Sequence, residues 1–464
     1  MKKYLFILVF ILGFSQINWQ IEIADSVRTD SGGIGWASLK LDILSQPRIV
    51  YYQSGWDTNW VKLIYLSKIQ GQWIKETVDS SYGYTTTNYY VWPDLCLDRN
   101  DHPHIAFVHR YSDNTVKLFY AKKVTNYWSI QKLDSIPEPH WSKPSLALDT
   151  NDYPGITWAY RSPVDTVWRI KYFHWDGISW NSEIAYDGND LPDFCPSLAV
   201  DFENRPHIVY YQRNPDSVKY AFWNGTNWQF WGDSTNQGMG GNYGPSLKLD
   251  SSGYPHFIHG WATNYVHWNG NFWESETTGA AGPLNYLDLD TDNLPHIAFL
   301  CDQRPAYCYR DSTGWHLCGY IEPDPYTVTG HSLSFCLDDN KPHVAYIGCG
   351  SGNWYRMKYA KGTFVGIEET DTRYRMHNTG REIEVSPTIC HKILNIKYMV
   401  SDAGEVELAI YDVCGKRIKS MVERDCPIGD YKKTLNISDL ACGVYFMVLK
   451  QNNEAVSKKF TIVR

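Results

Sequence analysis

Four arginines hold related positions in a recurring pattern and are the residues best suited to bind a ligand. Arg110, Arg161 and Arg213 each stand seven residues after a proline that opens a short apolar run, and Arg304 stands two residues beyond that position in a further copy. A guanidinium offers a planar fork of N–H donors that matches the oxygens of a carboxylate or a sulfate. We therefore predict that these arginines bind an acidic group.

Three aromatic residues, Tyr89, Trp92 and Trp141, fall in variable segments near these arginines and complete the predicted ligand-binding set. Aromatic faces beside polar donors are typical of sites that bind sugars. The competing interpretation is structural: the arginines pair with local carboxylates, and the aromatic rings pack between repeats.

Five histidines follow a proline in five separate copies of the pattern. Because they share one register in units that lie far apart around the fold, they cannot converge as a metal-ligand set. Buried polar groups need partners, so we expect each histidine to make a hydrogen bond within its own unit, with a repeated aspartate as the candidate partner. These histidines are His104, His207, His256, His296 and His343.

No spacing singles out a catalytic residue. The chain lacks a zinc-protease His-Glu-x-x-His motif, a nucleophile elbow, a phosphate-binding glycine loop and a sialidase Asp box. Asp288 to Asp292 carry alternating carboxylates, as at the start of a calcium loop, but the glycine and the bidentate glutamate of such a loop are missing. We therefore expect no metal and no cofactor. The histidines available for acid–base chemistry are His109, His140, His174 and His259.

An internal repeat positions all of these residues. In each copy a Leu-x-Leu-like run ends at an aspartate, and a proline then opens a second apolar run. Copies that recur every 40 to 56 residues indicate a repeat architecture. The anchoring aspartates are Asp42, Asp98, Asp149, Asp201, Asp250, Asp290 and Asp338, so there are seven units.

Each unit is predicted to contain four short strands, which makes it the blade of a β-propeller. The turns before the fourth strand carry Asp-Gly or Asn-Gly, as in Trp175 to Trp180, and these pairs suit a tight hairpin. The seventh unit lacks its Trp-led fourth strand, whereas Trp19 to Ser26 has that pattern at the other end of the chain. We therefore predict an all-β fold, a seven-bladed propeller over residues 16–364 that its N-terminal strand closes.

Composition limits the class of protein and its partners. The 464 residues include 20 Trp, 34 Tyr and 17 Phe, which excludes disorder, and the net charge of -8 argues against nucleic acid as a partner. Met1 to Ser15 has the basic start and apolar run of a secretory signal peptide, too short to serve as an integral membrane segment. Eleven cysteines cannot all pair within the chain, and Cys301 with Cys308 are candidates to bridge a hairpin.

The repeat ends before a polar linker at residues 365–382. Residues 383–464 then show six or seven alternating strands, predicted to form a small antiparallel immunoglobulin-like sandwich. Gly366 to Glu369, Ile410 to Arg417, Leu440 to Phe446 and Ser457 to Arg464 resemble the type A C-terminal sorting domain of the type IX secretion system. Ser386-Pro387 stands where that family has Asn-Pro. The resemblance implies export by the type IX machinery and a secreted, extracellular or outer-membrane-attached protein.

Two functions follow from these features. The propeller repeats resemble uncharacterised secreted propellers of sialidase-like or lectin-like type. We predict a secreted or cell-surface module that binds glycan, in particular acidic polysaccharide, or protein on its variable loops. The alternative is a secreted polysaccharide-degrading enzyme, either a sialidase-like hydrolase or a polysaccharide lyase, with its site on the same face.

Overall fold

The computed structural model divides the chain into two compact units, residues 1–367 and 368–464. The residues it describes contain strands and turns and no α-helix, and among them no helix could span a membrane. The predicted signal peptide, Met1 to Ser15, lies outside the described residues. The described residues are 16–29, 32–55, 60–82, 92–111, 113, 115–136, 143–162, 164–188, 192–213, 216–233, 244–260, 262–282, 284–322, 328–338, 340–350, 354–365, 383–386, 389–390, 392–400, 403–412, 417–438, 440, 443–451 and 454–462.

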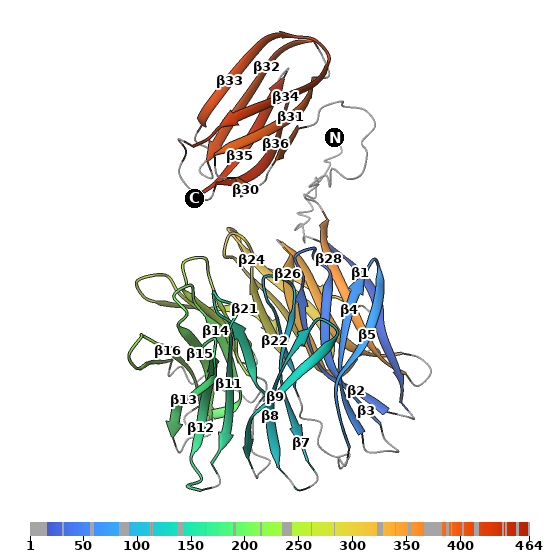
Figure 1. Ribbon diagram of the computed structural model, residues 1–464, viewed down its shortest axis with the longest axis vertical. Coiled ribbons are helices and arrows are strands. Elements are labelled where there is room, and N and C mark those ends of the chain that lie inside the picture. The colour runs from blue at the N-terminus through green and yellow to red at the C-terminus, as the bar shows by residue number, and fades with distance from the viewer. Residues whose placement is uncertain are drawn as a thin grey trace, which may run out of the picture. The chain divides into compact units, whose positions relative to one another are not determined.

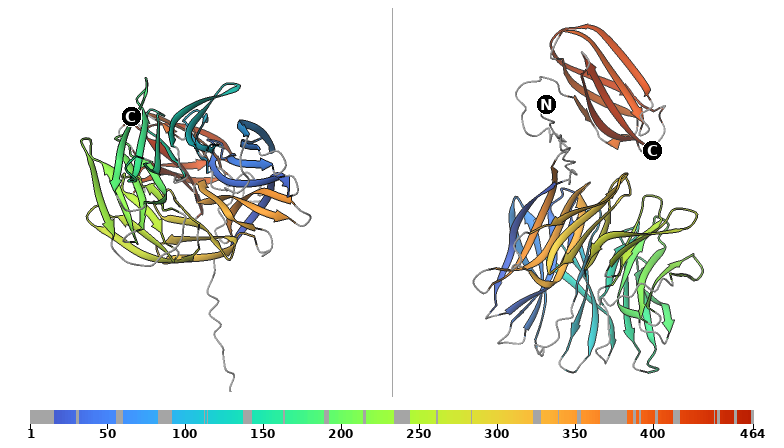
Figure 2. Two further views of the ribbon diagram at one scale, coloured as in Figure 1. Left: turned by 90° about the horizontal axis from the view of Figure 1, so that it is seen from below. Right: turned by 180° about the vertical axis from the view of Figure 1, so that it is seen from behind.

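The first unit consists of seven four-stranded sheets arranged as blades around a common axis (Figures 1 and 2), as predicted. Blades 1 to 3 contain β2 (Gly32–Leu41), β3 (Pro47–Gly55), β4 (Trp60–Ile69) and β5 (Gln72–Tyr82); β6 (Asp94–Leu97), β7 (Pro103–Arg110), β8 (Val116–Val124) and β9 (Tyr127–Ile136); β10 (Ser145–Leu148), β11 (Pro154–Arg161), β12 (Trp168–Trp175) and β13 (Trp180–Gly188). Blades 4 and 5 contain β14 (Pro192–Val200), β15 (Pro206–Arg213), β16 (Asp216–Trp223) and β17 (Trp228–Asp233); β18 (Ser246–Leu249), β19 (Pro255–His259), β20 (Ala262–Trp268) and β21 (Trp273–Ala281). Blades 6 and 7 contain β22 (Asn285–Leu289), β23 (Pro295–Cys301), β24 (Arg304–Asp311) and β25 (Gly314–Tyr320); β26 (Val328–Asp338), β27 (Lys341–Gly350), β28 (Trp354–Val365) and β1 (Gln16–Arg28).

The N-terminal strand completes the last blade. β1 pairs antiparallel with β28 from Gln16 opposite Val365 to Arg28 opposite Trp354, and the two strands lie side by side in Figure 1. The prediction that Trp19 to Ser26 supplies the missing fourth strand is therefore confirmed. β1 thereby covers the edge of β28, which would otherwise be left unpaired between the first and last units of the ring.

One aromatic contact recurs at every blade boundary and accounts for much of the aromatic content. The tryptophan at the start of each fourth strand meets edge-on a tyrosine of the third strand in the preceding blade, with ring centroids 5.1 to 6.0 Å apart. Trp19 makes this contact for the last blade, so the ring of contacts is complete. The pairs are Trp73–Tyr359, Trp128–Tyr65, Trp180–Tyr120, Trp228–Tyr172, Trp273–Tyr220, Trp315–Tyr265 and Trp19–Tyr307.

The anchoring aspartates and the histidines after proline are structural. In blade 4, Asp201 Oδ1 accepts backbone hydrogen bonds from Glu203 and Arg205, which closes the turn, while its Oδ2 lies 3.3 Å from His207 Nε2. The other histidine nitrogen lies 2.5 Å from Tyr220 Oη in the third strand. All five histidines contact such a tyrosine, a partner that the sequence did not indicate, so each makes a hydrogen bond within its own blade as predicted. Hydrogen bonds to the predicted aspartate are found for His207 and His296.

The second unit is formed by two sheets. One has the order β29 (Ile383–Ser386), β31 (Ile393–Val400) and β34 (Gly429–Asn436). The other has the order β30 (Ile389–Cys390), β36 (Glu454–Ile462), β35 (Gly443–Gln451), β32 (Gly404–Asp412) and β33 (Arg417–Cys426). The prediction of an entirely antiparallel unit is wrong in one detail, because the short β30 runs parallel to β36.

The proposed bridge between Cys301 and Cys308 is also wrong. Both cysteines are free, and the register of β23 with β24 places Cys308 opposite Ile297 and Cys301 opposite Arg304. The two cysteines are therefore offset by four positions along the hairpin, farther than a disulfide can reach.

Candidate binding site on the propeller axis

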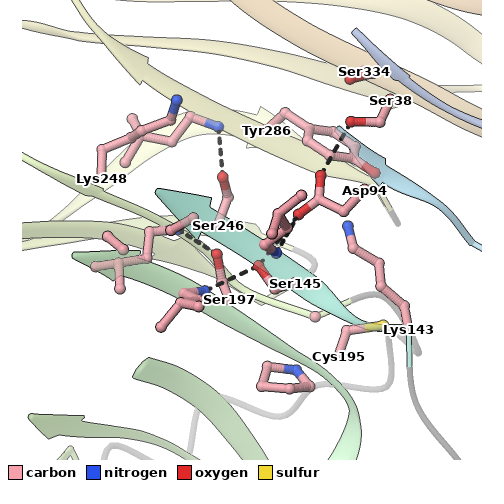
Figure 3. A pocket seen from close by; sticks show the side chains of 18 of the residues that line it. Ser38, Asp94, Lys143, Ser145, Cys195, Ser197, Ser246, Lys248, Tyr286 and Ser334 are labelled. Atoms are coloured by element: carbon pink, nitrogen blue, oxygen red, sulfur yellow. Dashed lines mark hydrogen bonds between the residues drawn. The ribbon is translucent and has the colours of Figure 1, made fainter. Parts of the chain in front are cut away.

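A cavity of about 350 Å³ lies where the innermost strands of the blades meet. Its wall comes from the first strand of every blade, β2, β6, β10, β14, β18, β22 and β26, and from the residues just before several of them. Figure 3 shows the lining, which includes Ser38, Asp94, Lys143 and Ser145. The fold thus brings side chains from all seven repeats to one place.

A closed ring of hydrogen bonds holds this wall together. In each blade a side-chain oxygen accepts a hydrogen bond from a leucine N–H in the first strand of the next blade, at 2.8 to 3.2 Å. Serines supply the acceptor in five blades and aspartates in two, and in blade 6 Asp288 acts because Tyr286 occupies the usual serine position. The acceptors are Ser38, Asp94, Ser145, Ser197, Ser246, Asp288 and Ser334.

Four charged side chains line the cavity, and a fifth, Asp288, contacts one of them. Lys248 Nζ lies 2.9 Å from Asp288 Oδ1, and Lys143 lies 5.3 Å from the ring centre of Tyr286 and points towards Asp94 (Figure 3). Asp94 accepts hydrogen bonds from Ser38 Oγ at 3.1 Å and from Leu146 N at 2.8 Å. The described lining therefore contains three lysines, Lys40 among them, and one aspartate, Asp94, while Asp288 contacts Lys248 from outside the lining.

Lys40 and Lys143 are charged at neutral pH, whereas the thiols of Cys96 and Cys336 are not. Burial alone would lower the pKa of Lys40, but Cys96, Asp94, Cys336 and Asp288 raise it above its ordinary value. The pKa of Lys143 is likewise raised, because the effects of Tyr286 and Asp94 outweigh burial. Burial raises the pKa of the Cys96 thiol to about 11 and that of Cys336 to about 12.

The predicted arginines lie on the face at which the cavity's first strands begin. Arg110, Arg161 and Arg213 each end the second strand of their blade. β6 begins with Asp94 opposite Ala106, so Arg110 lies four residues beyond the start of the inner strand. We call this end of the propeller the variable face, because the predicted variable loops are the connections at this end. Arg161 Nε also donates to Thr166 O at 3.1 Å within its own loop.

The other predicted site residues are Arg304, Trp92, Tyr89 and Trp141, and the structure describes the first two. The Arg304 guanidinium stacks 3.3 Å from the ring centre of Tyr320 in its own blade, where it meets a local partner. Trp92 is only 8% exposed and packs against Trp36 with ring centroids 4.5 Å apart, yet it lines the cavity. Tyr89 and Trp141 lie outside the described residues.

One histidine–carboxylate pair adjoins the arginines. His109 Nε2 lies 3.0 Å from Asp79 Oδ2, and burial, which would raise the pKa of Asp79, is outweighed by this contact, so that pKa is lowered. His109 is fully buried, and the rings of Tyr52, Phe107 and Phe119 surround it. The arrangement orders the boundary between blades and does not present the imidazole to a ligand.

The cavity lysines were missed from the sequence. Lys40 and Lys248 stand between two leucines in a Leu-Lys-Leu run, a pattern that ordinarily places lysine on a solvated strand face. The available signal was the serine that precedes the anchoring aspartate by four residues in five of the seven copies. An inward-facing serine repeated in this way indicates that this strand face lines the axis.

Comparison with known families identifies the tail. Residues 387–463 match the family model described as a secretion system C-terminal sorting domain, which confirms the resemblance to the type IX sorting domain. The match indicates a secreted or cell-surface protein. No curated protein sequence matches this chain.

Solved structures with related folds include several β-propellers. The polysaccharide lyase Uly1 has a TM-score of 0.49 at 10% identity, over 71% of this chain and 90% of that one. An α-L-arabinofuranosidase from Fusarium graminearum has a TM-score of 0.44 at 11% identity, over 73% and 97%. The six-bladed Aleuria aurantia lectin has a TM-score of 0.41 at 11% identity, over 61% and 94%. At this level of similarity none of them assigns an activity to this chain.

Proposed function

We propose that this protein is a secreted or cell-surface binding module that recognises an acidic glycan on the variable face of its propeller. The supporting observation is that two sets of cationic residues share that face. Arg110, Arg161 and Arg213 end neighbouring second strands there, and Lys143, which lines the axial cavity, stands just before β10. The protein as a whole is acidic, with a net charge of -8, so a local cationic surface selects anionic ligands.

We propose a separate role in export or binding for each of four segments of the chain. Residues 1–15 act as a signal peptide, the propeller occupies residues 16–364, residues 365–382 serve as the linker, and residues 383–464 engage the type IX secretion machinery. The two-sheet tail, with three strands facing five, supports an immunoglobulin-like sandwich for that sorting domain.

The competing proposal is a polysaccharide-degrading enzyme, and one contact bears on it. A general acid or base must come within hydrogen-bond reach of the substrate. His109 and Asp79 stand next to Arg110 at 3.0 Å from one another, but the histidine has no exposed surface. This geometry favours binding over catalysis.

The test compares the full-length protein with variants on an array of acidic and neutral polysaccharides, scoring both retention and product formation. We expect retention on acidic glycans and at least a tenfold loss of affinity when Arg110, Arg161 and Arg213 are all changed to Ala. The matched control is Arg99→Ala, because Arg99 lies in the turn after β6 at the opposite end of the blade, where it pairs with Asp152. Unchanged binding by the folded triple variant would refute the arginine site. Release of sugar products would favour the enzyme, and no retention on any polysaccharide of the array would refute the glycan ligand.

A further inference from the structure

The axial cavity carries an unbalanced positive charge. Its described lining contains the ammonium groups of Lys40, Lys143 and Lys248 and the carboxylate of Asp94. With Asp288, which pairs with Lys248 from outside the lining, one positive charge remains in excess. Cys96 and Cys336 do not compensate, because burial raises the pKa of both thiols far above neutrality. A charge held in a confined space is costly unless it is paired.

The contacts show which lysine has no carboxylate within salt-bridge distance. Lys248 has its own partner in Asp288 at 2.9 Å. Asp94 is held by Ser38 and Leu146, and Lys143 points towards it (Figure 3). Among the described residues, Lys40 has no carboxylate oxygen within the 4.0 Å of a salt bridge, although its ammonium group faces the same cavity.

We propose that this cavity binds one compact oxyanion group, a carboxylate or a sulfate, through Lys40 and Lys143. Its volume of about 350 Å³ lies in the range of pockets for small molecules and is large enough for a single sugar acid. Tyr286, beside Lys143, offers an aromatic ring to the body of that ligand. The inference rests on the proposed function only for the source of the anion, which is either one residue of a bound glycan or a free small anion.

The test is calorimetric titration of the full-length protein with D-glucuronate, acetate, inorganic sulfate and D-glucose. We expect binding of glucuronate with one site per chain, weaker binding at high salt, and no binding of glucose. Binding of glucuronate in preference to acetate and sulfate identifies a sugar acid as the source, and the reverse order identifies a free anion. Failure of all three anions to bind at millimolar concentration would overturn the proposal.

Variants locate the site and guard against misfolding. Lys40→Met and Lys143→Met are each expected to lose at least tenfold in affinity, whereas Lys132→Met, on the exposed face of β9, removes the same charge without effect. Asp94→Asn keeps the side-chain shape and raises the excess to two positive charges, so it should bind severalfold more tightly. Weaker binding by Asp94→Asn, or an equal loss in Lys132→Met, would contradict the site even if a cavity lysine variant failed to fold.

The two proposals fail separately. If the full-length protein binds glucuronate but is retained on no polysaccharide, the cavity site is supported and the glycan function is refuted. If polysaccharide retention depends on Arg110, Arg161 and Arg213 but no anion binds in the cavity, the glycan function is supported and the cavity site is refuted.

Discussion

Trp19 shows how a single residue closes the ring. It makes with Tyr307 the same edge-on contact that six other tryptophans make at the other blade boundaries, at a centroid distance of 5.8 Å. We expect Trp19→Ala to reduce the free energy of unfolding by about 2–3 kcal/mol, because it removes both apolar packing and an aromatic pair. Chemical denaturation followed by intrinsic fluorescence measures this loss.

Trp175→Ala is the control for that measurement. Trp175 is partly exposed and contacts Trp180 of its own hairpin, so it does not join two blades. A loss below about 1 kcal/mol is expected, as for a partly solvated aromatic pair. Equal losses for the two variants would mean that Trp19 has no special part in closure.

At the residue scale, the sequence predicts what repeats and misses what depends on the direction of a side chain. The histidines after proline could be assigned to hydrogen bonds within blades because their register recurs, but Tyr220 and its counterparts could not be named as partners. Those tyrosines stand 9 to 16 residues away, and only the pairing of the second and third strands brings them together. Lys40 was missed for the same reason, since polar alternation does not tell a solvated face from a channel wall.

The burial of these histidines makes the blades that carry them sensitive to acid. Burial lowers the pKa of His104 and of His256 to about 4 and that of His343 to about 3, so these rings are neutral in the folded protein at pH 7. In the unfolded chain they protonate near pH 6.5. The unfolded state therefore binds more protons between about pH 6.5 and 4, and stability falls as the pH falls through this window.

We expect the free energy of unfolding to drop by about 2 kcal/mol per such histidine between pH 7 and pH 5. Guanidinium titrations at both pH values measure it. His104→Gln should remove one histidine's share of the pH dependence, whereas His102→Gln, which changes an exposed neighbouring ring, should leave most of it. A stability that is flat between pH 5 and pH 7 would contradict the neutral, buried state of these rings.

The strands themselves were easier to predict than the way in which they pair. Alternation predicted six or seven strands in the tail, and its six long strands are β31 to β36 among the described residues, because a strand with one buried and one solvated face alternates, as β31 does. The parallel pairing of β30 could not be predicted, since two residues carry no periodicity. The direction of β23 relative to β24 was clear from sequence, but the offset of Cys308 from Cys301 follows from the register, which a short turn sets.

At the scale of the whole propeller, the first and the last strands of the propeller belong to one sheet. Blade 7 takes β26, β27 and β28 from the end of the repeat and β1 from its start, so the ring is closed by hydrogen bonds between distant segments. The circle of side-chain acceptors around the cavity closes at the same boundary, where Leu39 N donates to Ser334 Oγ at 2.9 Å. We therefore expect the geometry of the axial site to depend on the N-terminal strand, although that strand contributes no residue to the described lining.

Deleting residues 16–28 from the otherwise complete protein tests this dependence. The deletion exposes the edge of β28 and removes the contact of Trp19 with Tyr307, so we expect a lower unfolding midpoint, self-association on size-exclusion chromatography and at least a tenfold loss of anion binding in the cavity. A synthetic peptide of residues 16–28 should add back as a strand and restore the monomer, since an unpaired edge accepts an extended peptide. The same peptide with Trp19→Ala should bind at least tenfold more weakly. A deleted protein that stays monomeric, equally stable and indifferent to the peptide would show that the seven blades hold their ring without this clasp.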